Sequence, residues 1–462
     1  MVSRSFRRRL MGTETVTLRS PDRRRVFNNF LRVALGFGSF LVIGTILLST
    51  PMASSSGEGI KIFDAFFTAV SAICVTGLTV VDTQTQWSFF GELIILLLVL
   101  IGGLGYIAGI GVVLWIFGRS FGLRDRHLMR LYYGAPSLGE GFRFMRSLLI
   151  YAFGIQVIGF VVLSAVFLIV HEMPFGRAIW WGAFHAVSAF NCSGFNITGN
   201  DMVLFASDPE VLIPVGLLVF AGSIGSAAVV LSLFNKRVRQ VPLQVKLILY
   251  SAVGLVALGS LFFGVSEWNN PSTLATVDVS HRPVLAFFQT ITWTSGFSAI
   301  NAEFLNDWTK FFSSVLMLIG GAAGSPAGGI KLATVAVLFA SLFGFFRGRE
   351  DVAPFGRRIP KIAVYQAATI TLIFLAILFL ETFLLMLLSD FRFADVLYDA
   401  TSALATVGWS TGLTSEFNSG ARVVLICGML LGRFLPIILV LIMFRQRLRS
   451  TFRAQRDSIR IG

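Results

Sequence analysis

The stretch Asp399–Gly412, Asp-Ala-Thr-Ser-Ala-Leu-Ala-Thr-Val-Gly-Trp-Ser-Thr-Gly, is too short to cross a bilayer and too polar at its end to lie in one without partners. It predicts a short apolar helix that breaks at Thr406-Val407-Gly408. Such a half-helix would direct the partial negative charge of its carboxyl end at the membrane centre. Because irregular backbone survives at membrane depth only where it lines a cavity, we interpret the stretch as a pore loop whose backbone oxygens replace a cation's water.

Three other stretches resemble this one when they are aligned on a glycine. A small residue, a hydroxyl-bearing residue or Val precedes the glycine in each, and a large apolar residue follows it. The regular spacing of the four glycines predicts a fourfold internal repeat. The aligned stretches are Ser71–Leu78, Ser188–Phe195, Thr290–Phe297 and Ser402–Trp409.

The composition predicts a membrane protein. The 462 residues are 55% hydrophobic and only 13% charged, and the formal net charge is +14. Long apolar runs of this kind are typical of membrane spans. Three cysteines predict no disulfide framework, and the four histidines are not grouped at metal-binding spacing, so no cofactor is expected. Most Lys and Arg residues fall in the segments 1–32, 118–146, 235–246, 347–361 and 445–462.

The placement of these basic segments predicts the topology. Because basic loops stay in the cytoplasm, eight crossings follow, both termini are cytoplasmic, and the protein lies in the cell membrane. Concentrated in loops in this way, the positive charge does not indicate nucleic-acid binding. The basic arm is most simply a topology signal and a contact for anionic membrane lipid, and partner docking stays open as a weaker reading. We interpret Val33–Thr50 as a retained span, since cleavage as a signal peptide would remove a helix that the other repeats possess.

The expected fold is an all-α polytopic membrane protein. Four parallel span–pore-loop–span repeats, with eight transmembrane spans and four re-entrant pore loops, would surround a pseudo-fourfold pore. Inverted repeats, the usual plan of alternating-access carriers, are not indicated. The predicted units are a cytoplasmic arm 1–32, repeat one 33–117, repeat two 147–234, repeat three 247–346 with its second span broken at 320–330, repeat four 362–444 and a cytoplasmic tail 445–462.

The four glycines predict a selectivity filter. Rings of backbone carbonyls offset the dehydration of a cation without holding it tightly, and glycine takes positive φ without penalty, so that carbonyls can point inward. An ordinary turn would explain one such glycine, but not four at matching places behind apolar half-helices. The predicted filter residues are Val75, Thr76, Gly77, Cys192, Ser193, Gly194, Thr294, Ser295, Gly296, Thr406, Val407 and Gly408.

An acidic residue follows each glycine within five to eight positions: Asp82, Asp201, Glu303 and Glu416. A ring of carboxylates at an outer mouth would concentrate cations. Ordinary solvated loop charges, which contribute little, are the alternative, and the sequence leaves both open.

The glycine-rich stretch Gly320–Lys331 predicts a break in the second span of repeat three. Gly costs about 1 kcal/mol and Pro about 3 kcal/mol in a helix interior. A tightly packed small-residue helix is the alternative, but we favour a mobile loop under the filter that acts as a gate. Arg433 lies mid-span, where a charge should face water or a partner rather than lipid, so we expect it in the cavity below the filter rather than snorkelling. The gate residues are Gly320, Gly321, Gly324, Ser325, Gly328, Gly329, Lys331 and Arg433.

Together these features resemble the TrkH/KtrB family of potassium transporters over nearly the whole chain from about residue 30. The motifs that carry the resemblance are Ser71–Leu78, Ile101–Gly105, Gly320–Lys331 and Leu431–Arg433. A first span near residue 33 and eight spans in all look more like the KtrB branch than TrkH. The third pore helix looks about a residue shorter than the family's pattern, with Trp293-Thr-Ser in place of the more common Arg-Thr-Ala, and Pro326 replaces the usual Thr or Ser.

The resemblance implies potassium uptake through a pore, with K+ held at Gly77, Gly194, Gly296 and Gly408, where Gly77 favours potassium over sodium. It also implies a homodimer with one pore per subunit and a separate cytoplasmic ring of nucleotide-binding regulatory subunits. Potassium is then the substrate, and sodium is a candidate activator. A less selective potassium and sodium pathway and an organic-solute carrier remain the alternatives. The chain carries no HExxH or paired intramembrane carboxylates, so an enzyme is not expected.

Overall fold

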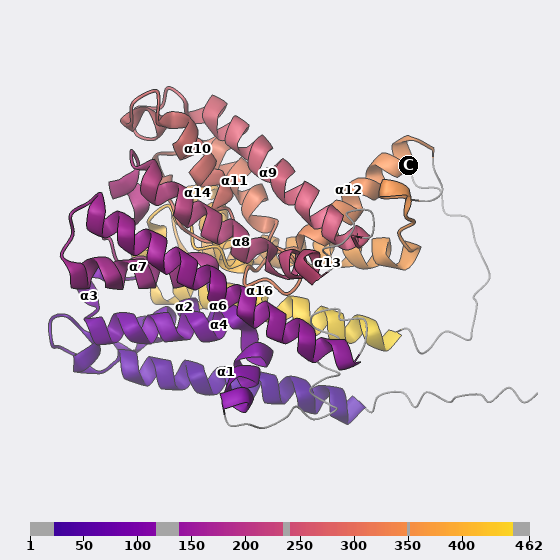
Figure 1. Ribbon diagram of the computed structural model, residues 1–462, viewed down its shortest axis with the longest axis horizontal. Coiled ribbons are helices and arrows are strands. Elements are labelled where there is room, and N and C mark those ends of the chain that lie inside the picture. The colour runs from indigo at the N-terminus through magenta and orange to yellow at the C-terminus, as the bar shows by residue number, and fades with distance from the viewer. Residues whose placement is uncertain (1–22, 117–137, 234–240, 349–351, 447–462) are drawn as a thin grey trace, which may run out of the picture.

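The computed structural model describes residues 23–116, 138–233, 241–348 and 352–446 (Figure 1). Within these ranges the chain is helical, and extended pairing is limited to isolated bridges. The main helices are α1 (Arg23–Leu48), α2 (Ile62–Cys74), α4 (Phe89–Ile116), α6 (Leu138–Ile169), α7 (Phe175–Phe190), α8 (Pro209–Leu233), α9 (Leu243–Glu267), α10 (Arg282–Ile291), α11 (Asp307–Leu318), α12 (Leu332–Phe346), α13 (Lys361–Leu388), α14 (Phe393–Ala405) and α16 (Ser419–Gln446).

The helices recur in the order long, short, long. The short members are α2, α7, α10 and α14. The helices α2, α7 and α14 each pack against both long helices beside them in the sequence, whereas α10 packs against α9 and α8. In the third group the last long member is divided, because α11 ends at Leu318 and α12 begins only at Leu332. The short turns α3 (Thr83–Gln86) and α15 (Leu413–Glu416) lie between a short helix and the long helix that follows it.

The short helices form the buried centre of the molecule. From Phe67 to Cys74 every residue of α2 is buried, and so is every residue of α14 from Tyr398 to Ala405. Each of these two helices has an acidic residue, Asp64 or Asp395, in its first turn, where it complements the positive end of the helix dipole. The small and apolar side chains that predominate over these residues suit such a buried place.

The long helices are apolar on the outside as well. Four of them are long and apolar enough to cross a membrane, judged on the residues that the structure describes: Arg146–Ile169 of α6, α9, α13 and Ser419–Pro436 of α16. Large side chains such as Phe379 and Leu387 of α13 remain 75% and 66% exposed. So large an exposed apolar surface indicates contact with lipid rather than water.

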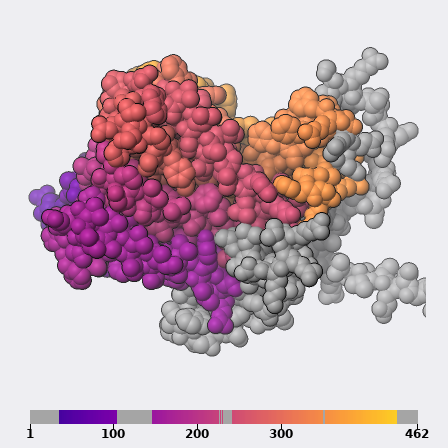
Figure 2. Space-filling view, turned by 45° about the horizontal axis from the view of Figure 1, so that its top comes forward, coloured from indigo at the N-terminus to yellow at the C-terminus, as the bar shows by residue number. Residues whose placement is uncertain are grey.

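These four helices account for four of the eight expected spans. The other four expected spans fall on α1, α4, α8 and the divided pair α11 and α12, whose described apolar parts are shorter. In Figures 1 and 2 the orange segment that includes α12 projects on one side of the molecule. Of the predicted arm and tail, residues 1–22 and 447–462 lie outside the described residues.

A buried ion pair holds α11 against α14. The ammonium group of Lys310, only 3% exposed, lies 2.6 Å from the carboxylate of Asp395 and donates to the Glu303 carbonyl at 2.8 Å. A second pair, Arg392 with Asp307, joins the same region at 2.7 Å but is more than half exposed.

The two pairs give a matched test of stability. Lys310→Met leaves the largely buried Asp395 carboxylate without its partner, which we expect to cost about 3–5 kcal/mol. Arg392→Met removes an exposed pair and should cost about 0–1 kcal/mol. Thermal unfolding of the purified variants in detergent checks this, and equal midpoints for the two variants would contradict it.

Candidate ion pathway

The segments that follow the four short helices meet each other at their glycines. A side-chain carbon built on Gly77 would lie 2.1 Å from the carbonyl oxygen of Ser193, and one built on Gly194 would lie 2.8 Å from the Cα of Gly296. The same carbon on Gly296 would lie 2.9 Å from the Cα of Gly408, and on Gly408 it would lie 2.1 Å from the carbonyl oxygen of Thr76. Each segment therefore touches the next in chain order, and the fourth returns to the first. We call this closed arrangement of the segments around Gly77, Gly194, Gly296 and Gly408 the ring.

The backbone at these points has left-handed conformations. The φ angles of Gly77, Gly194, Gly296 and Gly408 are 90°, 73°, 57° and 107°. Two residues before the glycine, Val75, Cys192 and Thr406 also have positive φ, of 60°, 54° and 50°. For residues other than glycine, such conformations cost about 1–3 kcal/mol each, and the surrounding structure must impose them.

A serine at the same place in three segments helps to fix this geometry. The hydroxyls of Ser71 and Ser402 accept hydrogen bonds from the N–H groups of Gly77 and Gly408, at 3.1 and 2.9 Å. In the second segment the hydroxyl of Ser188 donates to the carbonyl of Phe195 at 2.6 Å. These contacts hold the stretch that follows each short helix against the end of that helix.

The third segment departs from the other three. Its helix α10 has 10 residues, compared with 13 in both α2 and α14. The residue two before the glycine, Thr294, has no positive φ, unlike its three counterparts. The ring is therefore closed by three similar segments and one different segment.

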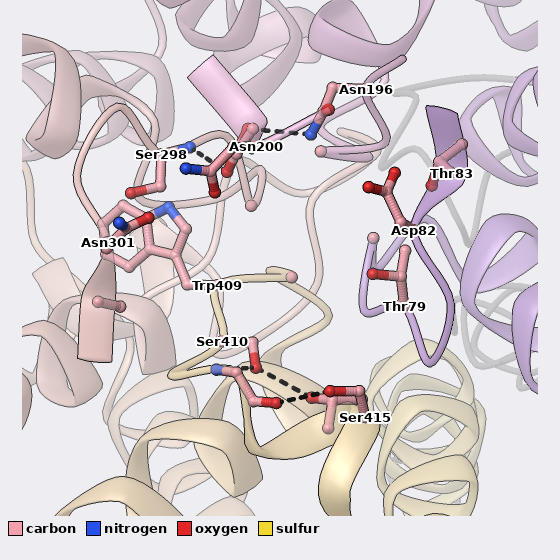
Figure 3. A pocket seen from close by; sticks show the side chains of 18 of the residues that line it. Thr79, Asp82, Thr83, Asn196, Asn200, Ser298, Asn301, Trp409, Ser410 and Ser415 are labelled. Atoms are coloured by element: carbon pink, nitrogen blue, oxygen red, sulfur yellow. Dashed lines mark hydrogen bonds between the residues drawn. The ribbon is translucent and has the colours of Figure 1, made fainter. Parts of the chain in front are cut away.

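A polar hollow of about 550 Å³ lies over the ring. All four glycines line it, and polar side chains reach it from all four segments, as Figure 3 shows for Asp82, Asn196, Ser298 and Ser410. Hydroxyl, amide and carboxylate groups are the ligands that suit a hydrated cation.

Three of the four expected acidic residues line this hollow. Asp82 and Glu303 are exposed, and the Asp82 carboxylate also accepts the N–H of Gln84 at 2.8 Å. Glu416 is exposed but is not among the lining residues, whereas its neighbour Ser415 is.

Asp201 lines the hollow but its carboxylate is engaged within the protein. It accepts hydrogen bonds from the backbone N–H groups of Met202 and Ser298, at 2.8 and 2.9 Å, and from the amide of Asn196 at 3.0 Å. Burial raises the pKa of Asp201 to about 8, and these backbone N–H donors oppose that rise. Asp201 therefore holds negative charge less readily at neutral pH than an ordinary carboxyl group, and it is the exposed Asp82 and Glu303 that face the hollow without such burial.

Asp399 is a buried acidic residue to which the sequence pattern assigned no role. One of its oxygens accepts the N–H and the hydroxyl of Thr411, at 2.9 and 3.1 Å. The other accepts the hydroxyls of Ser410 and Thr414, at 2.8 and 3.0 Å. Asp399 therefore fixes the return path of the fourth segment. It lies within α14, four residues after Asp395, and no local sequence pattern specifies its partners, so only the fold reveals them.

The glycine-rich stretch forms a loop beneath the ring. Its neck is closed by backbone hydrogen bonds, from Gly320 N–H to Ile330 O and from Ile330 N–H to Leu318 O, both at 2.9 Å. A side-chain carbon on Gly328 would lie 2.1 Å from the hydroxyl oxygen of Thr406. The loop therefore packs directly against the fourth segment of the ring.

Two basic residues contact this loop. The guanidinium of Arg433 donates to the carbonyl of Pro326 in the loop and to the carbonyl of Gly102 in α4. The ammonium of Lys331 donates to the carbonyl of Ala327. The loop between α11 and α12 is thus joined through Arg433 to both α16 and α4.

The model of the TrkH family, described as cation transport proteins, matches residues 13–452. The chain belongs to this family. The resemblance noted from the sequence is confirmed, and membership makes the chain a cation transport protein of the membrane rather than an enzyme.

Several TrkH family members of known name are similar to it. The Ktr system potassium uptake protein B of Bacillus subtilis is 31% identical, with 88% of this chain and 91% of the relative aligned. Its counterpart in Vibrio alginolyticus is 32% identical, over 89% and 90%. The potassium/sodium uptake protein NtpJ of Enterococcus hirae is 30% identical, over 93% and 96%.

A solved structure shares the fold. The potassium transporter TrkH from Vibrio parahaemolyticus matches with a TM-score of 0.63 and 17% identity, over 90% of this chain and 85% of that one. At this identity the likeness establishes the fold alone.

Asp399→Asn tests the anchoring of the fourth segment. The amide would turn an N–H donor toward hydroxyl and N–H groups that now donate, so we expect a loss of about 1–3 kcal/mol of stability. Glu416→Gln, an exposed acid shortly after the same segment, is the control and should change stability little. Thermal midpoints of the purified proteins decide the matter, and a midpoint for Asp399→Asn as high as that of the control would refute the anchoring role.

Proposed function

We propose that this protein is a potassium uptake transporter in which backbone carbonyls around the four glycines select the ion. The observation that carries the proposal is the contact of Gly77, Gly194, Gly296 and Gly408 with one another's segments. Only backbone can approach so closely, so main-chain oxygens are the groups available to replace the hydration shell of K+. The names of the relatives, which are potassium uptake proteins, favour the same ion.

The proposed pathway begins in the polar hollow. Asp82 and Glu303 raise the local concentration of cations there. The ion then loses water at the ring. Carbonyls beside those of the glycines contribute there, from Val75, Thr76, Cys192, Ser193, Thr294, Ser295, Thr406 and Val407. Because one relative is named a potassium/sodium uptake protein, a less selective pathway with sodium as a second ion or activator is the alternative within this class.

The proposed membrane arrangement follows from the order of helices. We assign α2, α7, α10 and α14 as re-entrant pore helices, and the long helices around them as eight spans in four parallel repeats. The buried ends of the short helices and the apolar exterior of the long ones support this assignment. The protein then lies in the cell membrane with both termini on the cytoplasmic side.

The proposed gate is the loop formed by 320–330. Its position beneath the fourth segment of the ring obstructs the pathway, and its glycines let it lie flat against backbone. Arg433 holds the loop and places a positive charge below the ring, where it slows a cation. As partners we propose a second copy of this chain and a separate cytoplasmic ring of nucleotide-binding subunits, as the family resemblance implies.

Gly408→Ser tests the filter. Its side chain would meet the carbonyl of Thr76, so the ring must distort and its preference for potassium over sodium should fall. Gly412→Ser is a matched control, because Gly412 also has positive φ, 93°, but nothing lies within 4 Å of the added carbon. Uptake of potassium or rubidium into vesicles holding the pure protein, with sodium compared, gives the readout. Equal selectivity in both variants would argue against the filter.

Arg433→Ala tests the gate. Without the guanidinium the loop loses its contact through Pro326 and the pathway loses a positive charge, so potassium flux should rise by about two- to tenfold. Arg422→Ala is the control, because Arg422 lies on the same helix but pairs with Asp64 at 3.0 Å. That change should not raise flux. Wild-type flux in the Arg433 variant, with the protein correctly folded, would remove this assignment.

A further inference from the structure

Trp293 lies between the end of α10 and Gly296, and its side chain is buried with 1% exposure. Its indole N–H does not contact the ring. It donates instead to the carbonyl of Ile319 at 2.7 Å. Ile319 directly follows Leu318, the last residue of α11, and is where the loop begins.

The bonded carbonyl belongs to the neck of the loop. Ile319 pairs with Ile330 in a short parallel bridge, and the flanking bonds join Gly320 to Ile330 and Ile330 to Leu318. Both ends of the loop therefore meet where the indole binds. A hydrogen bond at this place restrains the two ends together rather than one of them.

The next residue of the third segment reaches the same loop by a second route. The hydroxyl of Thr294 lies 2.6 Å from the hydroxyl of Ser223 in α8. The backbone carbonyl of Ser223 accepts the N–H of Ala322, inside the loop, at 2.7 Å. Trp293 and Thr294 are thus both joined to the loop, one directly and one through Ser223.

The other tryptophans near the pathway differ in this respect. The indole N–H of Trp409, which follows Gly408, donates to the carbonyl of Phe297 at 2.9 Å and so stays among the ring segments. The indole N–H of Trp87, buried near the outer turn α3, has no partner among the described residues. Of these three residues, Trp293 is the one that joins a ring segment to the loop.

We propose that Trp293 is a positioning residue that couples the ring to the loop, so that the loop leaves its place only when the third segment releases Ile319. The inference rests on the proposed function, in which the ring selects the ion and the loop is the gate. Coupling of two sites is reciprocal. An ion that orders the third segment therefore favours the retained loop, and displacement of the loop loosens the ring on that side.

The test uses Trp293→Phe in the full chain, reconstituted into vesicles with a potassium gradient. Phenylalanine keeps a buried aromatic side chain but removes the indole N–H. The Ile319 carbonyl is then left without its hydrogen bond while the loop is in place. We expect the maximal potassium flux to rise by about two- to tenfold. Trp87→Phe is the matched control, since it replaces a buried tryptophan with no hydrogen bond to lose, and it should leave flux unchanged.

A second background separates coupling from general damage. Deletion of 322–327 joins Gly321 to Gly328, whose carbonyl already lies against Gly320, and removes the part of the loop that we propose obstructs the pathway. In that chain Trp293→Phe should have no further effect on flux. A rise in flux that depends on the loop is a result that a loss of folded protein would not produce.

The outcomes distinguish this inference from the proposed function. If wild-type vesicles take up no potassium, or if the deletion does not raise flux, the proposed function or its gate fails first. If both behave as expected but Trp293→Phe matches Trp87→Phe, or lowers flux, the coupling role of Trp293 is overturned. An equal rise with and without the deletion overturns it as well.

Discussion

The structure depends on the close approach of four backbone segments at one place. A side-chain carbon at Gly77 or Gly408 would stand 2.1 Å from a neighbouring carbonyl oxygen, far inside any allowed contact. The absence of side chains there is what allows the ring to close. Closing the ring requires left-handed backbone at Val75, Cys192 and Thr406, which is energetically unfavourable for residues other than glycine. The buried helices and the serine hydrogen bonds around these residues impose it.

The loop between α11 and α12 depends on the same constraint. Its glycines bring backbone against backbone, at Gly320 within the loop and at Gly328 against the fourth ring segment. Since a loop of this composition has little cohesion of its own, its position is set by contacts from outside. Arg433, Ser223 and Trp293 supply them from three different helical regions.

The sequence predicted features that repeat or that are unusual in composition. Four glycines behind apolar half-helices indicated the central segments, apolar runs indicated the long helices, and family membership was confirmed. Contacts between residues far apart in the chain were not predictable, because no local pattern specifies them. The four hydroxyl and N–H donors around Asp399, the indole of Trp293 on Ile319 and the internal hydrogen bonds of Asp201 became visible only in the fold. The sequence does not distinguish an acidic loop residue that lines the hollow, such as Glu303, from one that lies outside it, such as Glu416.

The third segment, with its shorter helix and its ties to the loop, shows what a single polypeptide permits that an assembly of identical subunits does not. In a homotetramer every substitution appears in all four quarters, so symmetry is enforced by genetics. Here each of the four segments has its own stretch of sequence. One segment can therefore change the length of its helix and its contacts while the other three keep a similar backbone geometry.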